Sequence, residues 1–169
     1  MLRLVLLALS FGFLTSCAGY QFGGNKPEHL RGTESISIPL AKSRVIFPRV
    51  EALTTNSMVD ALVSDGTYRL TKNRMADATL LITLEAIDYQ QVRSSTVDVL
   101  RSEELQLRVT VSYKLADNKR PGIVLEAGRE RGDSRLFVDD NLQTARMNAL
   151  PDALQRATQS IIARLADGI

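Results

Sequence analysis

Cys17 is the residue whose surroundings most clearly define a chemistry, and it is the only cysteine of the 169-residue chain. Arg3 supplies a positive charge near the start, and residues 4–14 form an apolar run of about 11 residues, which matches a signal peptide core and is too short to span a bilayer. The sequence Leu-Thr-Ser then places one bulky and two small residues directly before the thiol. Such a thiol is suited to act as the nucleophile that accepts a diacylglycerol.

This pattern resembles the lipobox of bacterial lipoproteins. It predicts that residues 1–16 are a signal peptide and that Cys17 becomes the lipidated N-terminus. Each buried methylene contributes about 0.8 kcal/mol, so stable attachment takes more than one acyl chain. Ala18, rather than Asp, follows the cysteine, which indicates delivery to the outer membrane, on its periplasmic side. The alternative is an ordinary signal peptide cleaved elsewhere, with Cys17 incidental.

Other residues with catalytic potential lack the spacing that catalysis needs. The single histidine, His29, lies in a Gly- and Pro-containing segment in which we expect no partner to hold it. The acidic pairs at 103–104 and 139–140 are interpreted as solvated turns, and the Arg-Gly-Asp at 131–133 as coincidence. No phosphate-binding loop, hydrolase motif or metalloprotease motif is present in the sequence. We therefore expect no enzyme activity, no metal and no cofactor.

Arginines are the remaining candidates for a binding site. Arg93 and Arg101 bracket the loop between two predicted long strands, and Arg129, Arg131 and Arg135 are expected to follow the last strand. Arginine forks match phosphate oxygens, so a phosphorylated glycolipid would suit a cluster at one end of the sheet. The alternative is that these side chains are simply exposed to solvent and form only weak ion pairs with nearby carboxylates.

The overall charge argues against nucleic acid as a partner. The chain has 21 basic and 19 acidic residues, and removal of the signal peptide would take away only Arg3. A mature domain so evenly balanced lacks the basic surface of a nucleic-acid-binding protein.

The first half of the mature chain is predicted to contain a tether followed by a strand, a helix and a second strand. Residues 17–33 are predicted to be a lipidated tether, and a short strand follows at 36–40, limited by Pro39. Apolar residues at three- and four-residue steps predict a helix over 49–65, with a second strand at 68–71. A strand, a helix and a strand in this order imply parallel strands joined by a right-handed crossover.

The second half predicts an antiparallel meander and a final helix. Residues 78–86 alternate in polarity, as do residues 105–115. The residues of the first segment expected to share one dry face are Ala78, Leu80, Ile82, Leu84 and Ala86. A turn at 117–122 leads to a strand from 123 to about 131 or beyond, and a helix at 141–166 contains Pro151, where we expect a bend or the true start. Residues 34–169 thus predict one α/β (α+β) domain, a two-layer sandwich with two helices on one face of a four- to five-stranded mixed sheet.

Several segments, taken in order, resemble the LptE family of lipopolysaccharide-assembly lipoproteins. They are the cysteine followed by Gly and aromatic residues at 17–24, the strand at 36–39, the helix and its exit at 51–66, and the stretch 76–80. The resemblance implies a non-enzymatic, lipid-anchored subunit of the outer-membrane lipopolysaccharide translocon. Such a subunit plugs a large β-barrel partner, assists its assembly and contacts lipopolysaccharide.

By position, Arg93, Arg101 and Arg135 are the nearest equivalents of the basic residues through which the family contacts lipopolysaccharide. The chain departs from the family at 42–49, which lacks the Asn-x-Thr often found before the first helix, and in its basic tether residues Lys26 and Arg31. The alternative function is that of a periplasmic accessory lipoprotein that regulates a cell-wall synthase or an ABC lipid transporter.

Overall fold

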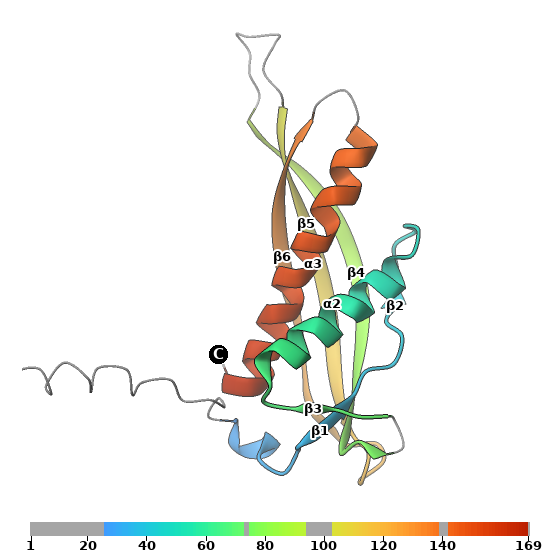
Figure 1. The fold of residues 1–169 in the computed structure, drawn as a ribbon, viewed down its shortest axis with the longest axis vertical. Helices are drawn as coiled ribbons and strands as arrows, with labels where there is room; N and C mark the ends of the chain where they lie inside the picture. The colour runs from blue at the N-terminus through green and yellow to red at the C-terminus, as the bar shows by residue number, and fades with distance from the viewer. Residues whose placement is uncertain (1–25, 73–74, 94–102, 139–141, 169) are drawn as a thin grey trace, which may run out of the picture.

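The structure, a computed structural model, describes residues 26–72, 75–93, 103–138 and 142–168. Figure 1 shows a long, twisted sheet with two helices lying across one of its faces. In chain order the elements are η1 Glu28–Leu30, β1 Ser35–Ser37, β2 Lys42–Ser43, α2 Val50–Asp65, β3 Arg69–Leu70, β4 Ala78–Arg93, β5 Glu103–Asp117, β6 Val124–Val138 and α3 Leu142–Asp167.

The sheet is mixed and has six strands, in the order β3-β1-β4-β5-β6, with β2 also paired to β4. The short strands pair in parallel, and β4, β5 and β6 form an antiparallel meander. This confirms the predicted two-layer α+β fold. The sheet exceeds the expected four to five strands because the two-residue β2 is too short to leave a periodic pattern.

The crossover between β1 and β3 is the predicted first helix. The expected range 49–65 is confirmed by α2, and Gly66 ends it in the left-handed region with φ 76°, its N–H donating to the Leu62 carbonyl at 3.2 Å. Met58 and Leu62 are fully buried against the sheet and α3. The expected shortness of the first strand is also confirmed, since β1 ends at Ser37, before Pro39.

One predicted facing in β4 is wrong. Ala86 was expected to share the dry face with Ala78, but it pairs with Thr110, whereas Ile87 pairs with Val109. The cause is a β-bulge between Leu84 and Ala86, which inserts one residue and exchanges the two faces of the strand as far as Gln91, where a second register shift precedes Arg93. Glu85 is the residue inserted at this bulge, and its carboxylate accepts a hydrogen bond from Ser112 on the open face.

The second helix is longer and less interrupted than its proline suggests. α3 runs from Leu142 to Asp167 with Pro151 inside it, so Pro151 is not its start. Its buried stripe packs on β5 and β6. Gly132 of β6 allows this close packing, since a Cβ built there would lie 1.9 Å from the Ala153 carbonyl oxygen.

The end of the predicted tether 17–33 rests on the domain. Leu30 is fully buried, and the Lys26 ammonium lies 4.5 Å from the centre of the Tyr68 ring.

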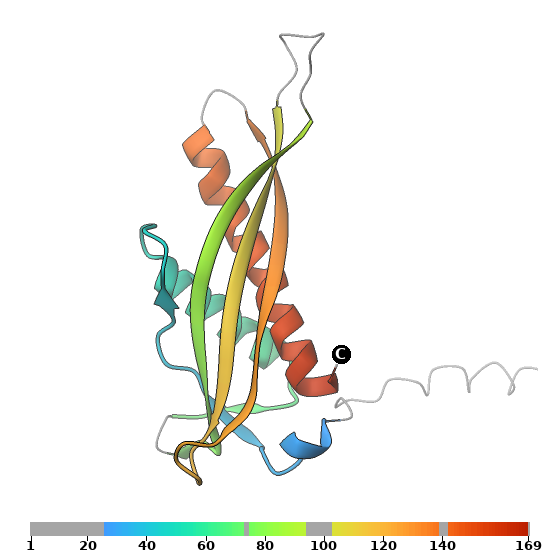
Figure 2. The same cartoon turned by 180° about the vertical axis from the view of Figure 1, so that it is seen from behind.

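The helices leave the other face of β4, β5 and β6 uncovered (Figure 2). Within the described ranges, no helix has the length and apolar character needed to cross a bilayer.

Candidate functional site

Two of the residues singled out from the sequence lie outside the part of the chain that the structure describes. These are Cys17, the predicted lipid attachment site, and Arg101. Arg93 is described only through its backbone, as the last residue of β4, paired in register with Glu104. The lipid attachment and the role of the Arg93–Arg101 loop therefore stay predictions.

Arg135 is described in full and lies near the same end of the sheet as Arg93. It pairs in register with Gln106, two residues from Glu104 along β5. Its guanidinium Nη1 lies 3.3 Å from Glu104 Oε1, while 74% of its side chain is exposed. The backbone of Arg93 at the end of β4 and Arg135 near the end of β6 therefore lie at the same end of the sheet, whereas the loop from 94 to 102 is outside the described residues.

The wider arginine cluster is not confirmed. Arg129, Arg131 and Arg135 were expected after the last strand, but all three lie within β6, because β6 continues to Val138 as the partner of β5. Their register partners on β5 show that they are spread along the strand on the open face: Arg129 pairs with Ser112, Arg131 with Thr110 and Arg135 with Gln106. Only Arg135 belongs to the sheet end.

Ion pairs neutralise part of this open face. Arg108 on β5 donates to both carboxylate oxygens of Asp133 on β6, at 2.7 and 3.2 Å. These hydrogen bonds lower the pKa of Asp133 and raise that of Arg108. The predicted Arg-Gly-Asp coincidence therefore has a structural explanation, since Asp133 binds Arg108 and Gly132 lies beneath α3.

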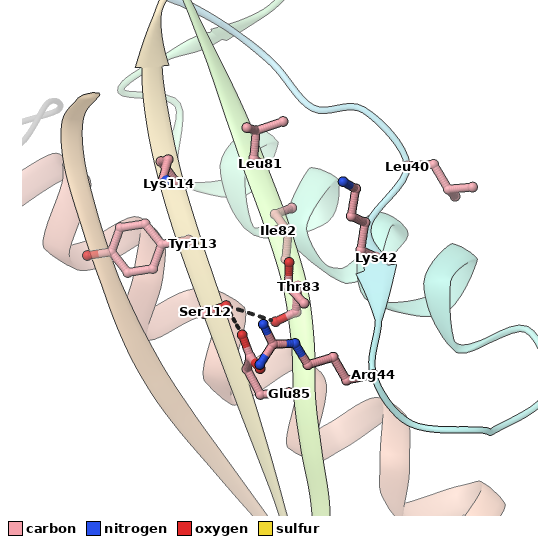
Figure 3. Close-up of a pocket in the computed structure, with 10 residues that line it drawn as sticks. All are labelled: Leu40, Lys42, Arg44, Leu81, Ile82, Thr83, Glu85, Ser112, Tyr113 and Lys114. Atoms are coloured by element: carbon pink, nitrogen blue, oxygen red, sulfur yellow. Dashed lines mark hydrogen bonds and ion pairs between the residues drawn. The ribbon is translucent and has the colours of Figure 1, made fainter. Parts of the chain in front are cut away.

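A groove on the open face was not anticipated from the sequence. It encloses about 350 Å³ between the segment around β2 and the middle of β4 and β5, as Figure 3 shows. Its lining residues are Leu40, Lys42, Arg44, Leu81, Ile82, Thr83, Glu85, Ser112, Tyr113 and Lys114.

One wall of the groove is held by a polar network at the β-bulge. Arg44 Nη1 lies 2.8 Å from Glu85 Oε2, and the Ser112 hydroxyl donates to Glu85 Oε1 at 2.6 Å. Both oxygens of Glu85 are thus engaged, and its side chain is only 14% exposed. This carboxylate is therefore committed to Arg44 and Ser112.

A cross-strand row of polar residues continues from the groove across the sheet. Lys42 pairs in register with Thr83, Thr83 with Ser112, and Ser112 with Arg129. Directly paired residues share one face of a sheet, so two hydroxyls lie between two cations. Among the described residues, no carboxylate forms an ion pair with Lys42 or Arg129. The row is suited to bind an anion.

The expectations for the other polar residues need two corrections. His29 was expected to have no partner, but its Nε2 lies 2.7 Å from Glu126 Oε2 of β6. The two residues are 97 positions apart, so no local pattern could reveal the contact. Glu103 and Glu104, interpreted as a turn, instead begin β5. Among the described residues, no three His, Cys, Asp or Glu side chains are grouped as metal ligands.

Solved structures with a similar fold include proteins from several bacteria. A minor lipoprotein from Acinetobacter baumannii is 14% identical, with a TM-score of 0.54 over 79% of this chain and 90% of that chain. A hypothetical protein from Chlamydia trachomatis is 12% identical, with a TM-score of 0.56 over 78% and 95%. The PelC dodecamer from Paraburkholderia phytofirmans is 13% identical, with a TM-score of 0.52 over 85% and 94%. At these identities the likeness concerns the fold.

Comparison with curated proteins finds no match. The family comparison is more specific, because the LptE model, described as lipopolysaccharide-assembly, matches residues 33–165. This range extends from the residues before β1 to the last turns of α3 and includes every strand of the sheet. The chain therefore belongs to the LptE family of lipopolysaccharide-assembly proteins.

Proposed function

We propose that this protein is the lipid-anchored subunit of the outer-membrane lipopolysaccharide translocon. In this role it occupies the lumen of a large β-barrel partner as a plug, assists the assembly of that barrel and contacts lipopolysaccharide, without catalysing a reaction. The observation that carries the proposal is the family match over residues 33–165, which covers nearly all of the described domain.

The anchor is assigned to Cys17. The sequence before it has the charge, the apolar run and the small residues of a lipoprotein signal. The described residues begin at 26, so eight residues lie between Cys17 and Lys26, and the nine steps along the chain span at most about 30 Å. An acylated Cys17 would hold the domain close to the periplasmic surface of the outer membrane.

Contact with lipopolysaccharide phosphates is assigned to Arg93, Arg101 and Arg135. The strand register supports this assignment for Arg93 and Arg135. Arg93 pairs with Glu104 and Arg135 pairs with Gln106, two residues further along β5, so both lie at one end of the sheet. The Arg135 guanidinium is 3.3 Å from Glu104 and its side chain is 74% exposed, whereas the Glu104 side chain is only 16% exposed. The exposed Arg135 guanidinium can therefore meet a phosphate from solvent while its neighbour Glu104 stays mostly buried.

Affinity purification from gently solubilised outer membrane tests the proposed role. The protein is expected to co-purify with a barrel of about 20 or more strands, a size at which a lumen can hold a plug. Recovery as a free monomer would contradict the proposal, and recovery with peptidoglycan synthases or an ABC transporter would support the accessory alternative. Cys17→Ser should abolish acylation, seen by intact mass, and leave the domain folded.

Binding to lipid A tests the phosphate contacts. Replacing Arg93, Arg101 and Arg135 together by Glu should weaken binding to phosphorylated lipid A much more than binding to its dephosphorylated form. Equal losses for the two lipids would contradict a phosphate contact at this end of the sheet.

A further inference from the structure

The groove on the open face lies far from the arginines of the sheet end. It is centred near Thr83, and β4 continues from there to Arg93, a distance of roughly 30 Å at the rise of a strand. Arg93 and Arg135 are not among its lining residues. Whatever binds in the groove is therefore recognised by a separate set of side chains.

The cations of the groove differ in their availability. Arg44 is held by Glu85, which is also bound by Ser112. Lys42 and Lys114 are exposed, and neither forms an ion pair with any carboxylate of the described residues. Two lysines that flank β4 without a counterion attract an anion.

Apolar side chains lie beside these lysines. Leu40 is 67% exposed and Leu81 is 44% exposed, and both line the groove. Leu81 pairs in register with Lys114, and Leu40 precedes Lys42 by two positions on the β2 side (Figure 3). A phosphate alone would leave the leucines in water, and an uncharged chain would leave the lysines without a partner.

We propose that this groove binds a phosphate-bearing amphiphile. The phosphate lies between the ammonium groups of Lys42 and Lys114, and the alkyl chain covers Leu40 and Leu81. The volume of about 350 Å³ is within the range of small-molecule sites, whereas a stable protein interface needs about 800 Å² from each partner. The proposal rests on the proposed function only for the source of the ligand, the lipids of the outer membrane.

The test uses the full acylated protein in neutral detergent, with dioctanoyl phosphatidic acid as the probe. Inorganic phosphate and dioctanoylglycerol are the two fragments of that probe, and calorimetry compares the three affinities. Phosphatidic acid should bind at least about tenfold more tightly than either fragment, because it satisfies both lysines and leucines at once. Equal affinity for either fragment would overturn the proposal, since it would show a free-anion site or a merely apolar one.

Variants then locate the site. Replacing Lys42 and Lys114 together by Gln should weaken phosphatidic acid binding about tenfold, the order expected for loss of charge-assisted contacts. The control removes two exposed charges elsewhere, with Arg69→Gln and Lys72→Gln, and should stay within about twofold of the parent. If the groove pair and the control pair bind alike, the proposal is wrong.

Two further variants separate charge, chain contact and folding. Lys42→Arg with Lys114→Arg keeps both charges and should retain binding, and loss of binding in this folded variant would count against the lysines as phosphate ligands. Leu81→Ser should weaken phosphatidic acid but leave inorganic phosphate unchanged, and an equal effect on both would overturn the chain contact. Barrel recovery by the Gln pair is a separate measurement, and it reports on the proposed function rather than on lipid binding in the groove.

Discussion

The two faces of the meander are formed by the same three strands, but one belongs to the core and the other is a polar surface. On the covered face, Leu107, Val109 and Val111 are fully buried beneath the helices. On the open face of the same strand, Arg108 forms an ion pair and Lys114 is exposed. Strand alternation sends successive side chains to opposite faces, so a single segment supplies both a core and a recognition surface.

This difference shows where substitutions should be costly. Apolar burial contributes about 25 cal/mol per Å² removed from water, and the covered face is close-packed against α3. Partly exposed ion pairs such as Arg108–Asp133 contribute about 1 kcal/mol or less. We therefore expect stability to depend on the covered face and ligand binding on the open face.

The largest effect is expected at the contact between β6 and α3. In Gly132→Ala the new Cβ would lie 1.9 Å from the Ala153 carbonyl oxygen and 2.6 Å from the Ala157 nitrogen, so α3 must move away from β6. We expect a loss of about 3 kcal/mol in the free energy of unfolding, measured by urea denaturation. Gly32→Ala is the control, because no atom lies within 4 Å of its Cβ position. Equal stability of the two variants would contradict the close approach.

A smaller effect is expected where Tyr68 joins the helix layer. Its hydroxyl donates to the Leu165 carbonyl at 2.6 Å, so Tyr68→Phe should lower the free energy of unfolding by about 1 kcal/mol. Burial raises the pKa of Tyr68 from 10.0 to about 12. The unfolded chain therefore loses this proton first, and stability should fall as the pH rises from 10 to about 12.

The pH dependence of Tyr68→Phe separates this hydroxyl from its neighbour. Burial also raises the pKa of Tyr113 to about 12, so the variant should keep part of the alkaline slope and lose the part due to Tyr68. Unfolding midpoints measured between pH 9 and 12, for parent and variant, provide the check. Identical slopes would show that the Tyr68 hydroxyl is not buried in the folded protein.

The smallest effect is expected on the open face. Asp133→Asn breaks the ion pair with Arg108. Because the Arg108 side chain is 31% exposed and the Asp133 side chain 40% exposed, the free energy of unfolding should fall by less than about 1 kcal/mol. Because Arg108 lowers the pKa of Asp133, the contribution is present above the ordinary carboxylate range and is lost as the pH falls through the lowered value. A double-mutant cycle with Arg108→Gln, at neutral and acidic pH, measures it. A loss as large as that of Gly132→Ala would remove the contrast between the faces.

Local patterns were sufficient for most elements. The helical spacing before Gly66 predicts α2, and the long alternation at 105–115 predicts β5 together with its buried face. These features depend on residues within a few positions of one another, where hydrophobic periodicity and capping act directly. The family resemblance, carried by several such segments in order, agrees with the family match over residues 33–165.

The sites depended more on contacts between distant segments. The bulge beside Glu85 exchanges the faces of β4, Arg135 lies within β6 rather than after it, and His29 meets Glu126 across the fold. None of these follows from a short-range pattern, because register is set by the pairing of whole strands.

The sequence by itself determined which residues are apolar, where the chain turns, and that a single cysteine follows a lipoprotein-like signal. Only the tertiary structure decided that Lys42, on the two-residue β2, and Leu40, just before it, line one groove with Leu81 and Lys114. The physical reason is that periodicity describes one segment at a time. A groove instead requires side chains from three strands, which sheet pairing brings together.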